Sequence, residues 1–284
     1  MSDLKTKIKL CAFADEADSC LDGQIKALRE NGITLLEIRG VDGQNIADIS
    51  LEKTHKIKET LDNNGIQVWS VGSPAGKTDI NADFSAEKER FVLMLEKGKI
   101  LGAKCIRLFS FYGTGGKKEY RDEVFFRLSE FVRMSRQYDI IPCHENEKGI
   151  YGENAARCLE IHKNVPDLMA VFDPANFIQC GQDVMEAWRM LSPYVYYGHI
   201  KDADSSGRIL PPGEGIGHIA DYLLDFAAKG CGVLTLEPHL AEFVGLSGLE
   251  NDNNKSNVGS LNFKNNREAF DCAADSLKKI IDRL

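Results

Sequence analysis

The sequence predicts an α/β protein in which eight strand–helix units close into a single (β/α)8 barrel. A unit of helix, glycine, apolar strand and polar loop repeats along the chain, most plainly at Gly32, Gly65, Gly102 and Gly230. Eight such units in 284 residues match the usual length of a closed barrel. An open doubly wound sheet is the alternative, but it would more often carry a glycine-rich phosphate loop after its first strand, where this chain has Ala14-Asp15-Glu16.

Each element is predicted from an apolar run or from an amphipathic run with capping residues. The strands are short apolar runs that follow helix stops, and we expect them at residues 8–13, 33–38, 66–71, 104–109, 140–144, 168–172, 195–200 and 232–239. Ser50 and Ser85 are expected to cap the helices that follow them. The predicted helices cover residues 21–30, 51–63, 86–101, 121–137, 154–163, 184–191, 218–229 and 265–284. We therefore expect one domain over residues 1–284, with a mobile polar surface loop at 251–257.

Composition and charge narrow the class of function. A hydrophobic content of 43% and a charged content of 27% are typical of a soluble globular protein. The net charge of −8 disfavours a nucleic-acid partner, and no apolar run approaches the roughly 20 residues that span a bilayer. The eight cysteines are dispersed and never form C-x-x-C, which indicates small buried side chains in a reducing cytoplasm. His55, His162 and His218 fall on predicted helices and are expected at the surface.

Four ionisable residues stand at the C-terminal ends of four consecutive predicted strands. They are Glu145, Asp173, His199 and Glu237. Closure of a parallel barrel brings these strand ends to one rim, where active sites of such barrels are found. Three carboxylates and one imidazole suit Mn²⁺, Mg²⁺, Co²⁺ or Zn²⁺, and a bound cation would remove the repulsion among the carboxylates. Each acidic residue taken alone is more simply a helix cap or a solvated rim group.

The same residues resemble motifs of a known superfamily. The chain is similar to the sugar phosphate isomerases and epimerases with a xylose isomerase-like TIM barrel, a group that includes tagatose and psicose epimerases, inosose dehydratase and endonuclease IV. The motifs that carry this resemblance are His144-Glu145-Asn146, Phe172-Asp173-Pro174-Ala175-Asn176, Gly198-His199-Ile200-Lys201-Asp202, Pro212-Gly213-Glu214-Gly215 and Leu236-Glu237-Pro238-His239. Weaker matches in the first half are Leu36-Glu37-Ile38-Arg39 and Ser73-Pro74-Ala75-Gly76-Lys77.

The resemblance implies one divalent metal ion held by Glu145, Asp173, His199 and Glu237. It also implies that Glu145 and Glu237 are the catalytic acid–base residues. A metal that polarises the sugar oxygens would stabilise the enediolate formed when a carbon-bound proton is removed. One base moving that proton gives an isomerase, whereas two bases on opposite faces give an epimerase. The sequence leaves both open.

Neighbouring polar residues are candidate substrate contacts. Asn176 stands where similar epimerases often carry histidine, and Lys201 and His239 share strand parity with His199 and Glu237. Cations in the loops after strands add further candidates, each of which can also be an ordinary rim group: Arg39, Lys77 and Arg208. Glu147 shares parity with Glu145, but we assign it no role.

Three other functions compete with a sugar isomerase or epimerase. A cyclic polyol dehydratase, of the inosose type, would use the same proton abstraction and then expel water. A nuclease of the endonuclease IV type would need several zinc ions and more histidines than His144, His199 and His239 near the rim. A sugar-binding barrel without activity would bind carbohydrate but not turn it over. A homodimer is expected by resemblance only.

Overall fold

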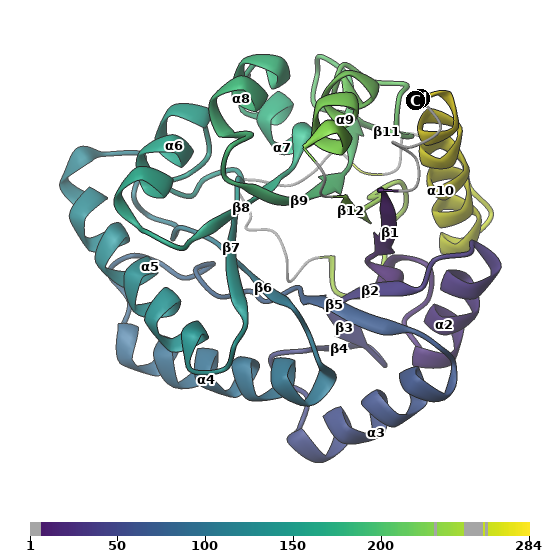
Figure 1. Ribbon diagram of the computed structural model, residues 1–284, viewed down its shortest axis with the longest axis horizontal. Helices are drawn as coiled ribbons and strands as arrows, with labels where there is room; N and C mark the ends of the chain where they lie inside the picture. Colours follow the sequence, from purple (N-terminus) through teal and green to yellow (C-terminus); the bar gives the residue numbers. More distant parts are fainter. Residues whose placement is uncertain (1–6, 230–231, 247–257, 259–260) are drawn as a thin grey trace.

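Eight parallel strands close into a barrel in the computed structural model, which describes residues 7–229, 232–246, 258 and 261–284 (Figure 1). The order around the barrel is β1, β12, β9, β8, β7, β6, β5 and β2, and β2 pairs with β1 to close the ring. The strands are β1 (Lys9–Ala12), β2 (Leu35–Ile38), β5 (Gln67–Val71), β6 (Cys105–Leu108), β7 (Ile141–Glu145), β8 (Met169–Phe172), β9 (Val195–Ile200) and β12 (Val233–Leu236). This arrangement confirms the predicted fold class.

Helices surround the barrel and cover its outer face (Figure 1). They are α2 (Leu21–Glu30), α3 (Leu51–Asn63), α4 (Phe84–Leu101), α5 (Arg121–Arg136), α6 (Ala155–Asn164), α7 (Pro174–Gln179), α8 (Val184–Leu191), α9 (Ile219–Ala228) and α10 (Asn266–Arg283). The last helix, α10, lies beside α2. An ion pair between Arg267 of α10 and Glu30 of α2, at 2.6 Å, joins the two helices. The two ends of the chain thus complete the helical ring together.

One of the two predicted serine caps is confirmed and the other is wrong. The Ser50 side chain accepts a hydrogen bond from the Lys53 amide at 3.1 Å, as expected for the cap of α3. Helix α4 begins earlier than predicted, because Asp83 caps it and accepts from the Ser85 amide at 2.9 Å. The predicted mobile loop at 251–257 lies outside the described residues.

The barrel interior is layered along its axis. Alternate residues of each strand point inward, so that residues two apart stand one above the other. The lower layer is apolar and is formed by Cys11, Cys105, Cys143, Val171, Tyr197 and Val233. Residues two positions further along three of these strands are ionisable, namely Arg107, Glu145 and His199. The sequence therefore places an apolar layer beneath a charged layer at the C-terminal end of the barrel.

Several short elements sit at that end and were not predicted. A single 3₁₀ turn, η1 (Ala14–Glu16), follows β1, and a second, η2 (Lys118–Tyr120), precedes α5. Two antiparallel pairs extend the loops after β2 and β9, namely β3 (Gly40–Val41) with β4 (Gln44–Asn45), and β10 (Asp202–Ala203) with β11 (Ile209–Leu210). Two-residue strands give no periodic signal, which is why sequence patterns do not reveal them.

The structure corrects the prediction for one of the three helical histidines. His162 is buried, with its Nδ1 atom 3.1 Å from the Leu168 carbonyl oxygen and its ring stacked on Tyr194 at 5.2 Å. It lies on the face of α6 that packs against the barrel rather than on the solvent face. Cys11, Cys105 and Cys143 are buried and unpaired as expected, whereas Cys231 lies outside the described residues. Within the described ranges, no helix is both long and apolar enough to cross a membrane.

Candidate active site

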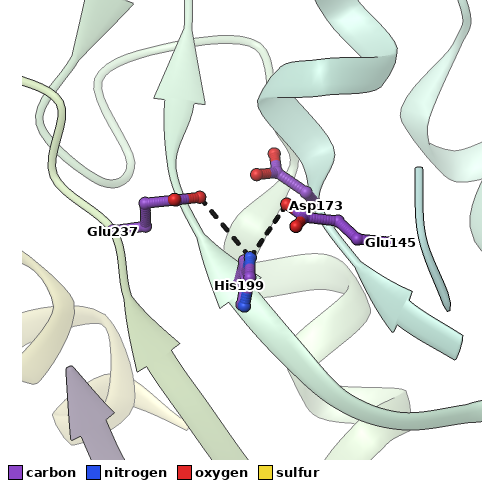
Figure 2. Close-up of side chains that lie close together, drawn as sticks. All are labelled: Glu145, Asp173, His199 and Glu237. Carbon is purple, nitrogen blue, oxygen red and sulfur yellow. Dashed lines mark hydrogen bonds and ion pairs between the residues drawn. The ribbon is translucent and has the colours of Figure 1, made fainter. Parts of the chain in front are cut away.

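The four residues predicted as metal ligands come together at the C-terminal end of the barrel (Figure 2). Glu145 ends β7, Asp173 follows β8, His199 lies near the end of β9, and Glu237 follows β12. Each offers one donor atom, and these four atoms all lie within 4.8 Å of one another. All four side chains are buried. Residues separated by up to 92 positions thus form one compact donor set because consecutive strands close a ring.

His199 lies at the centre of this set, and its two ring nitrogens have different partners. Nδ1 is 3.0 Å from Glu145 Oε1 and 3.4 Å from Glu237 Oε2, and Figure 2 shows these two carboxylates on opposite sides of the ring. Nε2 is 3.1 Å from Glu37 Oε2, on the lower side. Burial alone would lower the pKa of His199, but Glu145 and Glu37 raise it well above its ordinary value. The imidazole is therefore held between carboxylates above and below.

Glu37 belongs to a hydrogen-bonded group beneath the donor set. Its other oxygen, Oε1, accepts from Tyr197 Oη at 2.8 Å and from Ser70 Oγ at 3.1 Å. Burial would raise the pKa of Glu37, but His199 and Arg107 lower it overall, so the carboxylate is ionised. A cation in the donor set would require the Nδ1 proton of His199 to leave, and an ionised acceptor at Nε2 favours the tautomer that keeps its proton there.

Asp173 is held in place by its neighbours as well as by its strand. Its Oδ1 atom accepts from the Asn176 amide at 3.0 Å and so caps the short helix α7. The Asn146 side chain accepts from the Asp173 amide at 3.0 Å and donates to the Asp173 carbonyl at 2.9 Å. The Asn176 side chain donates to the Asn146 carbonyl at 2.9 Å and lies 3.4 Å from Glu145 Oε1. Asn176, predicted as a substrate contact, thus stands next to the donor set.

Two buried cations pair with the three carboxylates. Lys201 Nζ lies 2.9 Å from Asp173 Oδ2 and 3.2 Å from Glu237 Oε2. Arg107 Nη1 lies 3.2 Å from Glu145 Oε2 and 4.0 Å from Glu237 Oε1. Burial raises the pKa of Asp173 to about 7 against the opposing effect of Lys201. Burial would also raise the pKa of Glu237, but Lys201 and His199 hold it well below its ordinary value.

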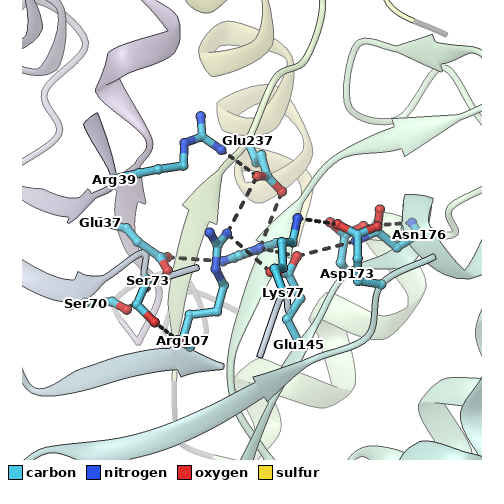
Figure 3. A network of polar contacts seen from close by, with 12 residues as sticks. Glu37, Arg39, Ser70, Ser73, Lys77, Arg107, Glu145, Asp173, Asn176 and Glu237 are labelled. Atoms are coloured by element: carbon cyan, nitrogen blue, oxygen red, sulfur yellow. Dashed lines mark hydrogen bonds and ion pairs between the residues drawn. The ribbon is translucent and has the colours of Figure 1, made fainter. Parts of the chain in front are cut away.

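Arg39 contacts Glu237 (Figure 3), and it also binds a second group of carboxylates beside it. It makes a bidentate pair with Asp15 at 2.9 and 3.0 Å, and it reaches Glu16 Oε1 and Glu237 Oε1 at 3.0 Å each. Burial raises the pKa of Glu16 to about 8 even though Arg39 opposes this shift. The predicted substrate contact Arg39 therefore supports Glu237 from the side away from Asp173.

His239 completes this side of the site in a left-handed backbone conformation, with φ of 46°. Its amide donates to Glu16 Oε2 at 2.7 Å. The ring is buried, and its Nδ1 atom has no hydrogen-bond partner among the described residues. Glu16, Glu237 and His239 also offer donor atoms within 4.8 Å of one another, but the Arg39 guanidinium already contacts both of these carboxylates.

The remaining predicted residues differ in their distance from the donor set. Lys77 pairs with Glu147 at 3.1 Å, in a partly buried pair of the barrel mouth. Arg208 lies in the turn between β10 and β11, where it is 48% exposed at its side chain and pairs with Asp204 at 2.9 Å. His144 was expected near the rim, but it points out of the barrel and contacts Ser110 Oγ at 3.0 Å, because neighbouring strand residues face opposite sides.

The donor set fits a divalent cation by its own chemistry. Three carboxylate oxygens and one imidazole nitrogen converge, and two buried oxygens among them, Glu145 Oε2 and Asp173 Oδ2, have no hydrogen-bond partner in the described part of the chain. Buried carboxylate oxygens that lack hydrogen bonds are costly unless an ion satisfies them. Lys201 and Arg107 satisfy them only by charge, at ion-pair distance.

Glu37 and Arg107 are site residues to which sequence reasoning assigned no role. Each lies inside an apolar strand, in Leu35-Leu36-Glu37-Ile38 and in Cys105-Ile106-Arg107-Leu108. A charged residue within a buried apolar run, on the parity that faces the barrel axis, is the signal that could have revealed both. Asp15 and Glu16 give a weaker signal, because polar residues directly after a strand are typical of any surface loop.

The family of the chain follows from a comparison of its sequence with protein-family models. The model described as "Xylose isomerase-like TIM barrel" matches residues 25–254. The chain belongs to the xylose isomerase-like TIM barrel family. This match spans β2 to β12 and so includes all four residues of the donor set. Among curated proteins, none matched the chain.

Several solved structures share the fold of the chain at low sequence identity. A D-allulose 3-epimerase from Methylomonas sp. is 16% identical, with a TM-score of 0.75 and 98% of each chain covered. The IolI protein, whose structure has a bound zinc atom, is 17% identical, with a TM-score of 0.72 and 97% of this chain and 99% of that chain covered. The probable 3-DHS dehydratase AsbF from Bacillus anthracis is 16% identical, with a TM-score of 0.72 and 96% and 98% covered. At these identities the likeness shows the fold alone.

Proposed function

We propose that the protein is a divalent-metal-dependent isomerase or epimerase of a sugar or sugar phosphate. One observation carries the proposal. Four donor atoms, one each from Glu145, Asp173, His199 and Glu237, lie within 4.8 Å of one another, and the Nε2 atom of His199 contacts the buried carboxylate of Glu37. Glu145, Asp173, His199 and Glu237 would hold one cation, of Mn²⁺, Mg²⁺, Co²⁺ or Zn²⁺. Membership of a family with epimerase and dehydratase members supports this reading.

The bound cation would act as a Lewis acid that polarises the carbonyl and hydroxyl oxygens of the sugar. The residues of the chain would move the proton. Glu145 and Glu237 lie on opposite sides of His199 and would each present a carboxylate to one face of a sugar bound between them (Figure 2). Glu145 or Glu237 would remove a proton from a carbon next to the carbonyl. Lys201, Arg107 and Asn176 would donate hydrogen bonds to sugar oxygens that become electron-rich in this step.

Return of the proton decides the type of product. If the same carboxylate returns it to the neighbouring carbon, an aldose and a ketose interconvert. If the carboxylate of the opposite face returns it to the same carbon, the product is an epimer. A dehydratase would share the first step, after which the substrate would lose a hydroxyl group as water. The likeness to a probable dehydratase is the reason to test for this second reaction as well. The partner is then a small carbohydrate, and a homodimer and a cytoplasmic location stay predictions.

The experiment combines metal content with hydrogen exchange. The purified protein would be loaded with Mn²⁺, analysed for metal, and incubated with ketoses and their phosphates in D₂O. We expect about one ion per chain, solvent deuterium in the sugar, and loss of turnover in both Glu145→Gln and Glu237→Gln. Loss of water from the substrate would assign the dehydratase reaction instead. A binding barrel without activity would take up sugar with no exchange, and Glu145→Gln and Glu237→Gln would leave that binding largely intact.

A further inference from the structure

Lys201 and Arg107 pair with all three carboxylates of the donor set. Lys201 contacts Asp173 and Glu237, and Arg107 contacts Glu145 and approaches Glu237. Both cations are almost completely buried, with exposed fractions of 4% and 3%. A divalent cation that binds these carboxylates must therefore compete with the two side chains that neutralise them. Lys201 and Arg107 are the internal counter-ions of the donor set.

Arg39 and Lys77, two further cations of the barrel mouth, do not share this property. Arg39 contacts Glu237 as well, but it keeps a bidentate partner in Asp15 when Glu237 is engaged elsewhere. Lys77 pairs with Glu147, which lies outside the donor set. Metal loading would thus take the direct ion-pair partners of Lys201 and Arg107, and it would leave the pairs of Arg39 with Asp15 and of Lys77 with Glu147 in place.

The lost contacts show what the loaded site would lack. Glu37 and Glu147 also face Arg107 and Lys201, so the two cations keep acidic groups in their surroundings after metal loading. Their direct ion pairs are nevertheless with the donor set, so both cations would need a new acceptor once a metal binds these carboxylates. An anionic group of the substrate can supply that acceptor, and a carboxylate offers two oxygens in one plane.

Arg107 also has the geometry for such a ligand. Its Nε atom is buried and has no hydrogen-bond partner among the described residues, while Phe13 and Phe109 lie 5.1 and 4.9 Å from its guanidinium carbon. A guanidinium held against aromatic rings keeps a fixed plane, and a fixed plane suits bidentate binding of a carboxylate. Lys201 can contribute a point charge on the side of Asp173 and Glu237.

We propose that metal loading releases Lys201 and Arg107 to bind a carboxylate group of the substrate, so that the substrate is a sugar acid. This inference rests on the proposed function, because it needs a cation in the donor set. It adds to that function the class of substrate and a coupling between binding of the metal and binding of the substrate carboxylate. The metal and the carboxylate should each bind more tightly in the presence of the other, by equal factors.

The test measures Mn²⁺ affinity by calorimetry in the presence of three unreactive polyols. D-glucitol is neutral, D-gluconate carries a carboxylate, and D-glucitol 6-phosphate carries a phosphate. After correction for Mn²⁺ chelated in solution, we expect D-gluconate to tighten Mn²⁺ binding about tenfold more than D-glucitol does. Equal effects of all three would overturn the inference, and a larger effect of the phosphate would reassign the class to sugar phosphates. Absence of Mn²⁺ binding would remove the proposed function as well, so the two failures are distinct.

Two variants test the counter-ion role separately. Lys201→Met removes the competitor of the metal, so Mn²⁺ should bind about tenfold more tightly without any polyol, and the preference for D-gluconate should shrink. Lys97→Met is the matched control, since it removes a buried lysine whose Nζ donates to the Ile46 and Ala47 carbonyls, outside the donor set, and Mn²⁺ affinity should stay within about twofold. Weaker Mn²⁺ binding in Lys201→Met than in the wild type would contradict the role of Lys201. The polyol series needs only the wild-type chain, so the proposal remains testable if Lys201→Met folds poorly.

Discussion

The Nε2 atom of His199 lies 3.1 Å from Oε2 of Glu37, and both side chains are fully buried. The pair joins a residue of β2 to a residue of β9. The two residues are 162 positions apart in the sequence, and two strands, β1 and β12, lie between β2 and β9 around the ring. Contacts of this kind behind a metal-binding histidine set its tautomer and its ring orientation. The geometry of the donor set thus depends on a strand that contributes no donor to it.

Glu37→Gln should weaken metal binding by about 10- to 100-fold, because the charge that favours a proton at Nε2 of His199 is removed. Tyr197→Phe is the matched control. It removes one of the two donors to the other carboxylate oxygen, leaves Ser70 as the second, and should change metal affinity by no more than a few fold. Calorimetric titration with Mn²⁺ or Zn²⁺ measures both variants. Wild-type affinity in Glu37→Gln would show that Glu37 serves the core rather than the histidine.

Asp173 should combine two separable roles, one at each oxygen. Asp173→Asn keeps an acceptor for the Asn176 amide, so the α7 cap and the stability of the fold should persist while metal affinity falls. Asp173→Ala removes the cap too and should cost about 1 kcal/mol of unfolding free energy from that loss alone. Urea denaturation and metal titration of the two variants separate these effects. Equal stability of Asp173→Asn and Asp173→Ala would show that the cap contributes little.

Gly76 is expected to tolerate no side chain. Its φ is 83°, and an added Cβ would lie 2.0 Å from the Phe109 carbonyl oxygen. The same segment hydrogen-bonds to the chain after β6, because the Phe111 amide donates to the Gly76 carbonyl at 2.8 Å. Gly76→Ala should therefore destabilise the protein by more than about 3 kcal/mol and disturb the position of Lys77.

Gly32→Ala provides the comparison for Gly76→Ala. Gly32 has a similar φ of 65° but no atom within 4 Å of an added Cβ, so only the backbone conformation is penalised, by about 1–2 kcal/mol. Unfolding free energies from urea titrations test the pair. Similar losses in the two variants would mean that the contact with Phe109 relaxes easily.

His162 should make the protein less stable as the pH falls below about 6.5. Burial lowers the pKa of His162 to about 4 in the folded state, from an ordinary value of 6.5. Between these values the unfolded chain binds a proton at His162 that the folded chain does not, so stability is fully present above 6.5 and is lost as the pH falls toward 4. The loss from this group is about 3 kcal/mol.

The variant His162→Gln isolates this contribution. His144, whose pKa is also lowered by burial, packs against His162 and titrates in both proteins. Urea denaturation of the wild type and the variant from pH 7.5 to 4.5 should therefore show a shallower decline for the variant. Parallel curves would mean that His162 takes up its proton without unfolding.

The barrel and the donor set were predictable because both depend on strong local patterns. Strands are buried on both faces, so each is a continuous apolar run, and Glu145, Asp173, His199 and Glu237 mark where such runs end. The helix limits depend on capping side chains within one turn, and the error at α4 arose because Asp83 and Ser85 are both good caps.

The supporting residues could not be predicted with the same patterns. Glu37 and Arg107 lie within strands, and their roles depend on which neighbours the ring closure supplies. Whether Lys201 competes with a metal depends on how close its Nζ atom lies to Asp173 and Glu237, and strand parity does not give these distances. His162 shows the same limit on a helix, because a polar residue on a buried face looks like a surface residue until its partner, the Leu168 carbonyl, is known.

Asp202 holds the segment 213–217 with one carboxylate, and this has a practical consequence for protein engineering. Oδ2 accepts from the Gly213 and Gly215 amides at 2.8 and 3.1 Å, and Oδ1 accepts from the Gly217 amide at 2.9 Å. An added Cβ at Gly215 or Gly217 would lie 2.3 or 2.6 Å from Oδ1. A library that randomises these glycines to change substrate preference would displace the Asp202 carboxylate and break its hydrogen bonds in most members. The exposed turn at residues 204–208 of the same connection offers a better place for diversity.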